Sequence, residues 1–247
     1  VEIAMPGNKV GLTLRAYRPA RELTPTDVSE REDEDDVFHA RDARRVVDDE
    51  DLPEFEWTKE QLDEIAEGAA DDEVAEEAVE SADEEESDEA SDEEVPVFLT
   101  HKGKLLLFKS AQGLASFLKS KEPHDLAQLK NWKKFSGKVK AADIEPEEGD
   151  SYELDLVVEN LRGGPDAWDP ALLLGAGEIA RDLGYALQLK KVQTALAPGS
   201  PLDDLDEALR STGFFARRKL RKIGSEQASI SWRSVIGKIS SAVDWRD

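Results

Sequence analysis

The residue types that most often carry catalysis are few in this sequence, and their spacing builds no recognisable site. Histidine occurs three times, at His39, His101 and His124, and no two are spaced as ligands of one metal ion. Cysteine is absent, which excludes disulfide scaffolds, thiolate metal sites and cysteine nucleophiles. Glycine-rich phosphate loops and the GxSxG serine motif do not occur either. We therefore expect no catalytic residue, no cofactor and no bound metal ion, in a protein that is not an enzyme.

One polar cluster nevertheless has the composition of a cleft wall. Glu159, Asn160 and Arg162 precede two glycines, and Trp168 follows them in the stretch VVENLRGGPDAW. A carboxylate, an amide, a guanidinium and an indole could line a pocket, which would be the site of an enzyme. The same residues could instead form the end of a helix that side-chain hydrogen bonds tie to the following loop. Both interpretations stay open at this point.

Two basic stretches could contact phosphate or nucleic acid. Residues 102–140 contain ten lysines against Glu122 and Asp125, a net charge of +8, and residues 217–222 read RRKLRK. Basic residues interleaved with aromatic ones neutralise phosphates and stack on bases. The alternative is an ordinary solvated helical face. The candidate contact residues are Lys130, Lys133, Lys134, Arg217, Arg218, Lys219, Arg221 and Lys222.

The negative charge is concentrated in one internal segment. The net charge of the chain is −24, and residues 21–100 carry 34 acidic and 6 basic side chains, a net charge of −28. A stretch with so much charge and so few apolar residues cannot bury enough area to offset the entropy of ordering. We expect residues 19–95 to be an acidic, mostly disordered insert. A capping box at Thr58 and Gln61 predicts a short helix over 59–67 within it.

A few large apolar side chains stand out within this acidic insert. They are the candidate residues for binding a partner: Leu52, Phe55, Trp57, Leu62 and Ile65. Opposite charge would speed the encounter with a basic partner surface, and the desolvated apolar side chains would hold the complex. Two other interpretations remain. The insert could be only a solubilising spacer, or it could fold back onto the basic stretches of the same chain and compete with phosphate ligands.

Two β-hairpins are predicted on either side of the insert. Residues 1–18 have turn residues at 6–8, and residues 97–108 have them at 101–103. The apolar run LLLF in the second hairpin predicts a strand that is covered on both faces. An isolated hairpin is only marginally stable. We therefore expect the two hairpins to pair into one small sheet.

Helical signals dominate from residue 110 onward. Ser110, Asp169 and Ser200 are N-cap candidates, and a proline follows the last two directly. Over residues 150–161 the apolar spacing favours a helix, although a strand also fits. The sequence thus predicts an α+β fold, with a small antiparallel sheet from hairpins 1–18 and 97–108 followed by a mostly helical C-terminal half.

The expected organisation has four parts. They are the N-terminal hairpin of the folded core (1–18), the acidic insert (19–95), a basic part with a hairpin and helices (96–149) and a helical C-terminal part (150–247). No apolar run is long enough to cross a membrane, and the N-terminus lacks the features of a signal peptide. We expect a cytoplasmic protein, with a few residues preceding Val1 because the chain does not begin with methionine.

Several stretches resemble a family of actinobacterial proteins that are often labelled "primosomal protein". The stretches that carry the resemblance are ELDLVVENLRGGPDAWDP, ALAPGSPLDDLDEAL, IGKISSAVDW, GLTLRAYRP and PVFLTHKGKLLLF. The resemblance covers most of the foldable chain, and the family label implies a link to DNA replication. It carries over no functional residues, because no catalytic motif defines the family.

The most economical function is that of a non-enzymatic interaction or regulatory protein. We expect it to act on a nucleic-acid machine of replication or transcription, with the acidic insert binding or screening basic surfaces. The first alternative is a nucleic-acid-binding protein that uses residues 102–140 and 217–222 and is autoinhibited by the insert. The second is an enzyme with a cleft around Glu159, Arg162 and Trp168.

Overall fold

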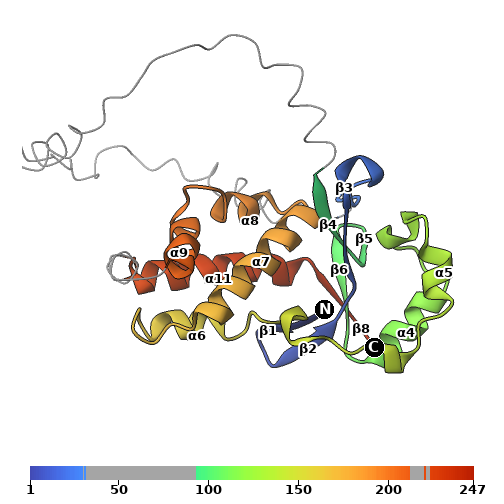
Figure 1. The fold of residues 1–247 in the computed structure, drawn as a ribbon, viewed down its shortest axis with the longest axis horizontal. Coiled ribbons are helices and arrows are strands. Elements are labelled where there is room, and N and C mark those ends of the chain that lie inside the picture. Colours follow the sequence, from blue (N-terminus) through green and yellow to red (C-terminus); the bar gives the residue numbers. More distant parts are fainter. Residues whose placement is uncertain (30, 32–92, 212–219, 221–222) are drawn as a thin grey trace, which may run out of the picture. The chain divides into compact units, whose positions relative to one another are not determined.

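A computed structural model describes residues 1–29, 31, 93–211, 220 and 223–247 (Figure 1). All of them belong to one compact unit, Val1–Arg31 with Asp88–Asp247. The predicted short helix over 59–67 and the five apolar anchor residues of the acidic insert lie outside the described residues, as do Arg217–Lys219, Arg221 and Lys222.

The N-terminal hairpin is confirmed. Strand β1 (Glu2–Met5) pairs antiparallel with β2 (Lys9–Leu12), and the turn between them gives Gly7 and Asn8 positive φ angles of 87° and 56°. Glycine and asparagine tolerate this left-handed conformation better than other residues. Leu12 of β2 pairs with Phe108 of β6 (Lys104–Phe108), so the two predicted hairpins do share one sheet.

The chain leaves this sheet after β2 and enters a second one. Strand β3 (Arg15–Pro19) pairs antiparallel with β4 (Glu94–Phe98) along its whole length, and these two strands form a separate two-stranded sheet. Strand β5 (Thr100–His101) then turns back onto β6 through Lys102 and Gly103. Residues 15–18 therefore pair with β4 instead of extending the first hairpin.

Two short strands join the larger sheet by parallel pairing. The antiparallel sheet predicted from the sequence included neither strand. Strand β7 (Ser151–Glu153) pairs with β1, and β8 (Val243–Arg246) pairs with β6. The larger sheet has the order β5-β6-β2-β1-β7, with β8 on β6. The prediction of a helix from residue 150 is therefore wrong in its first part, because β1 recruits residues 151–153 as a strand.

The helix starts that depend on local capping are confirmed. Ser110 accepts a hydrogen bond from the Gly113 amide at the start of α4 (Ala111–Lys119). Asp169 caps α7 (Pro170–Ala186) and Ser200 caps α9 (Pro201–Arg210), each with the expected proline at the first turn. The other helices are η1 (Ala20–Glu22), η2 (Asp125–Gln128), α5 (Trp132–Ser136), η3 (Ala141–Asp143), η4 (Glu148–Asp150), α6 (Val157–Arg162), α8 (Lys190–Ala195) and α11 (Ser225–Ser241).

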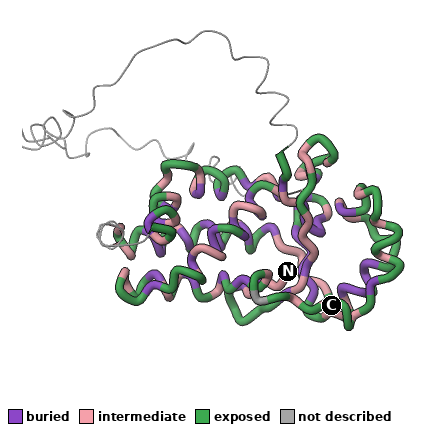
Figure 2. Tube along the Cα trace, in the orientation of Figure 1, coloured by how far each residue is buried: buried purple, intermediate pink, exposed green. Residues whose placement is uncertain are grey.

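Strand β6 separates two apolar cores, which confirms that it is covered on both faces. Leu105 and Leu107 face the core built by α6, α7, α8, α9 and α11, whereas Leu106 and Phe108 face a smaller core with α4. The alternation follows from the two-residue period of a strand. In Figure 1 the strands accordingly lie between these helices and the pair α4 and α5, and buried residues recur along the long helices in Figure 2.

The architecture confirms the predicted fold class, α+β with a small sheet and a mostly helical C-terminal half. Burying each large side chain of β6 stabilises the fold by about 1.5–3 kcal/mol relative to an exposed position. Among the described helices, none combines the length and apolar composition that crossing a membrane requires.

Candidate protein-docking groove

The polar cluster predicted as a cleft wall ties a helix end to its loop. The Trp168 indole is buried and donates a hydrogen bond to the Leu161 carbonyl at 2.9 Å. The Asn160 side chain accepts one from the Asp169 amide at 3.0 Å. Arg162 and Glu159 form an exposed contact of 3.5 Å along the same helix. Asn160 and Trp168 thus join the end of α6 to the start of α7. The Trp168 indole N–H and the Asn160 side-chain oxygen both bond to the backbone there.

The candidate lysines of the first basic stretch lie around η2 and α5, on the smaller core. Lys130 pairs with Glu22 at 2.8 Å, and Lys133 and Lys134 are exposed on α5. Lys133, Lys134 and Lys138 have no ion pair with any described residue. The second stretch, 217–222, contributes only Leu220 to the described residues.

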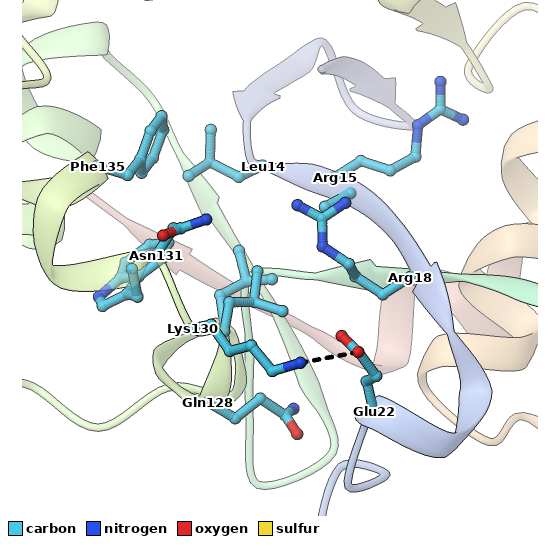
Figure 3. Close-up of a pocket in the computed structure, with 12 residues that line it drawn as sticks. Leu14, Arg15, Arg18, Glu22, Gln128, Lys130, Asn131 and Phe135 are labelled. Carbon is cyan, nitrogen blue, oxygen red and sulfur yellow. Dashed lines mark hydrogen bonds and ion pairs between the residues drawn. The ribbon is translucent and has the colours of Figure 1, made fainter.

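A concave surface between β3 and α5 is the best candidate site, and we call it the β3–α5 groove. Its volume is about 550 Å³, within the usual range of ligand-binding sites. Half of its lining residues are apolar. The lining residues are Leu14, Arg15, Ala16, Arg18, Glu22, Leu126, Gln128, Leu129, Lys130, Asn131, Trp132 and Phe135 (Figure 3).

Polar contacts clamp the two walls of the groove together at one end. The Gln128 side chain accepts a hydrogen bond from the Thr24 amide at 2.6 Å and donates one to the Thr24 carbonyl at 3.2 Å. The Lys130 ammonium reaches across to the Glu22 carboxylate, as the dashed line in Figure 3 shows. This hydrogen bond lowers the pKa of Glu22. Because each contact joins residues more than 100 positions apart, the clamp depends on the tertiary fold.

A row of aromatic rings supports the other wall and leads from the sheet to the surface. The ring of Phe108 lies 5.0 Å from that of Phe117, which lies 5.7 Å from the His124 ring. His124 meets the Trp132 ring edge-on at 4.5 Å, and Trp132 lies 5.7 Å from Phe135. Phe135 ends the row with 45% of its surface exposed. Burial lowers the pKa of His124, so the row holds a neutral imidazole.

Arg15 fixes β3 against helix α7. Its guanidinium contacts the carboxylates of Glu178 at 3.0 Å, Asp182 at 2.9 Å and Asp150 at 3.0 Å. It also donates to the Tyr152 hydroxyl at 2.8 Å. Although Arg15 lines the groove, these contacts direct its charge away from it, as Figure 3 shows.

The same network perturbs the tyrosine beside it. Burial, together with the hydrogen bond that the Tyr17 hydroxyl donates to Asp182 at 2.6 Å, raises the pKa of Tyr17 to about 12. Burial opposes the charge on Arg15, but the hydrogen bonds to Glu178 and Asp182 outweigh it and raise the pKa of Arg15. Arg15 therefore stays charged and Tyr17 stays neutral across the physiological range, which suits a structural anchor.

The lining of the groove is partly apolar and partly cationic. It combines an apolar floor with cationic side chains at its rim, and the sequence pattern pointed to only part of it. Lys130 belonged to the predicted basic stretch, and Leu14 and Ala16 lay within the predicted hairpin 1–18. The groove itself was missed because residues 14–22 and 126–135 meet only in the folded chain. Among the described residues, no group of three or more histidine, aspartate or glutamate side chains could hold a metal ion.

Comparison with known proteins places these elements in a described family. Residues 88–240 match the family described as "SatS C-terminal domain". The fold is similar to a solved structure titled "The crystal structure of SatS c-terminal domain in complex with bromine", with a TM-score of 0.52 and 25% sequence identity. That similarity covers 61% of this chain and 81% of the other. No curated protein matches the chain. These matches do not test the resemblance to proteins labelled primosomal, which stays a prediction.

Proposed function

This chain belongs to the SatS C-terminal domain family, and we propose that it is a non-enzymatic interaction protein that binds a partner polypeptide in the β3–α5 groove. The observation that carries the proposal is the exposed Phe135 at the end of an aromatic row, beside a concave surface with a cationic rim. Exposed aromatic side chains beside apolar hollows are typical of the centres of protein interfaces. We retain a complex of replication or transcription as the expected class of partner.

The proposal is tested by capturing partners with matched surface variants. The full chain, Phe135→Asp and Ile230→Asp would be incubated with nuclease-treated extract from the native organism, and bound proteins identified by mass spectrometry. Both substituted side chains are exposed, Phe135 at 45% and Ile230 at 51%, so neither variant disturbs a core. Ile230 lies on α11, outside the groove.

We expect the unmodified chain and Ile230→Asp to recover the same partners, and Phe135→Asp to lose them. Recovery of one set of proteins by all three would contradict the proposal. Replication or transcription proteins within the lost set would support the expected class of partner.

Nucleic-acid binding is the second candidate function. It is favoured by four exposed lysines around α5 that have no ion pair to any described residue, Lys133, Lys134, Lys138 and Lys140. Binding through phosphates would weaken steeply with salt, by about 0.9 log units per contacted phosphate for each tenfold change in concentration. It would also strengthen on deletion of residues 32–87, which carry 26 acidic and 4 basic residues, a net charge of −22. A flat salt response or unchanged affinity after deletion would exclude this candidate.

A further inference from the structure

We propose that the occupant of the β3–α5 groove is an acidic peptide segment that carries at least two large apolar side chains and crosses Phe135. This inference rests on the proposed function and adds the chemistry of the partner. Three features of the structure carry it: the hollow that adjoins the groove, the sign of the charge around both, and the packing of the aromatic side chains.

A second hollow continues the groove on the far side of Phe135. It has a volume of about 480 Å³ and shares Asn131 and Phe135 with the groove. Lys134, Lys138 and Val139 line its other side together with Asp143. Because the two hollows share a wall, one extended ligand can place an apolar side chain in each. The exposed ring of Phe135 then lies beneath the ligand between its two anchors.

The charge around both hollows is positive. Between Asp125 and Asp143 the chain has five lysines and no acidic residue. The carboxylate on the groove rim, Glu22, is already paired with Lys130, and Asp143 accepts a hydrogen bond from the Lys140 amide at 2.9 Å. Four lysines consequently remain without an ion pair to any described residue, namely Lys133, Lys134, Lys138 and Lys140. A ligand with carboxylates beside its apolar anchors would complement this pattern.

The aromatic side chains favour a peptide over a nucleic acid. A single-stranded nucleic acid needs open ring faces on which its bases stack. The Trp132 ring already has the His124 ring at 4.5 Å and the Phe135 ring at 5.7 Å as neighbours. The apolar lining of the groove instead comes largely from aliphatic side chains, such as Leu14, Leu126 and Leu129, which accept the side chains of a peptide.

The test uses a peptide whose composition meets the proposal. A fluorescent peptide with the sequence of residues 49–57, DEDLPEFEW, carries five acidic side chains and has large apolar ones at Leu52, Phe55 and Trp57. Binding would be followed by fluorescence anisotropy. The receptor is the full chain with Leu52→Ser, Phe55→Ser and Trp57→Ser, so that its own copy of the sequence does not compete.

Two substitutions in the receptor address the two halves of the proposal. Phe135→Ser removes the apolar contact between the hollows, and Lys134→Glu with Lys138→Glu reverses the charge. We expect each to weaken binding by about tenfold, as the loss of an interface hot spot does. The charge effect should shrink at high salt, whereas the effect of Phe135→Ser should persist. The matched controls, Ile230→Ser and the pair Lys119→Glu with Lys121→Glu, should change affinity by less than about twofold.

Three results would overturn the inference. The first is peptide binding that the groove variants and the controls weaken equally. The second is a single-stranded oligonucleotide that displaces the peptide and binds more tightly through the same lysines. If the peptide fails to bind while Phe135→Asp still loses partners from extract, the proposed function survives and only the acidic chemistry of the partner is refuted.

Discussion

Removing the guanidinium of Arg15 should destabilise the folded chain and loosen β3, one wall of the groove. The Arg15 side chain is 9% exposed and contacts three carboxylates, of which Asp182 is 15% exposed and Asp150 and Glu178 are 44% and 51% exposed. In Arg15→Met the methionine cannot satisfy Asp182, so a largely buried carboxylate is left without its cation. We expect a loss of about 3 kcal/mol in the free energy of unfolding, the lower end for a broken buried pair.

The exposed partners of Arg15 should contribute much less. Solvent screens the pairs with Asp150 and Glu178, and exposed pairs contribute about 0–1 kcal/mol each. Asp150→Asn is therefore the matched control, with an expected loss below about 1 kcal/mol. At ~2–4 °C per kcal/mol for a chain of this size, Arg15→Met should lower Tm by about 6–12 °C.

Urea unfolding followed by circular dichroism measures both variants. A second substitution tests the cause, because Asp182→Asn in the Arg15→Met background removes the stranded carboxylate and should recover about 1 kcal/mol or more. An Arg15→Met chain within about 1 kcal/mol of the unmodified one would refute the assignment of Arg15 as the anchor of β3.

Three further substitutions test the packing around the groove and the sheet. Burial lowers the pKa of His124, so the neutral imidazole stabilises the fold above the unfolded-state pKa of about 6.5, and this stabilisation is lost as the pH falls below that value. Between about pH 7.5 and 5.5 the unmodified chain should therefore lose more resistance to urea than His124→Phe. Equal losses in the two chains would contradict this expectation. Gly11→Ala should destabilise the sheet by about 1–3 kcal/mol, since its Cβ would lie 2.8 Å from Leu107 and 2.9 Å from Trp245. Gly237→Ala, in open space on α11, should instead raise the free energy of unfolding by about 0.5–1 kcal/mol. A Gly11→Ala chain that is more stable than the Gly237→Ala chain would refute the packing described.

The parts of the fold that sequence predicted are those with local signals. Ser110, Asp169 and Ser200 each form a cap with the residues directly after them, and a cap needs no distant partner. The LLLF run predicted a strand buried on both faces because only such a position removes four consecutive apolar side chains from water.

The parts that escaped prediction depend on distant pairing. Strands β7 and β8 are short, and each is defined by a parallel partner more than 100 residues away, β1 and β6 respectively. Residues 151–153 thus form a strand although the spacing that follows them is helical. Of the two interpretations that the sequence left open for Asn160 and Trp168, the structure shows the helix end tied to its loop, because both side chains join α6 to α7.

The β3–α5 groove also escaped prediction, because its two walls come from segments far apart in the sequence. The lysine content of residues 102–140 indicated a charged surface, and Lys130 lines the groove. Nothing local could indicate that Leu14 and Ala16 would face Leu129 across a hollow, because their meeting depends on the β3–β4 sheet and on the clamp from Gln128 to Thr24. The groove became visible only when both of its walls were placed in the folded chain.

Site-directed photo-crosslinking from position 135 tests the central claim most directly. A benzoylphenylalanine at Phe135 would be compared with one at Ile230 in the full chain, in cells and after illumination. Both side chains are about half exposed, so the two probes have similar access to solvent. If the β3–α5 groove is the docking site, a discrete crosslinked partner forms from position 135 and is absent from position 230. Equal crosslinking from both positions, or crosslinking from position 230 alone, would contradict the account.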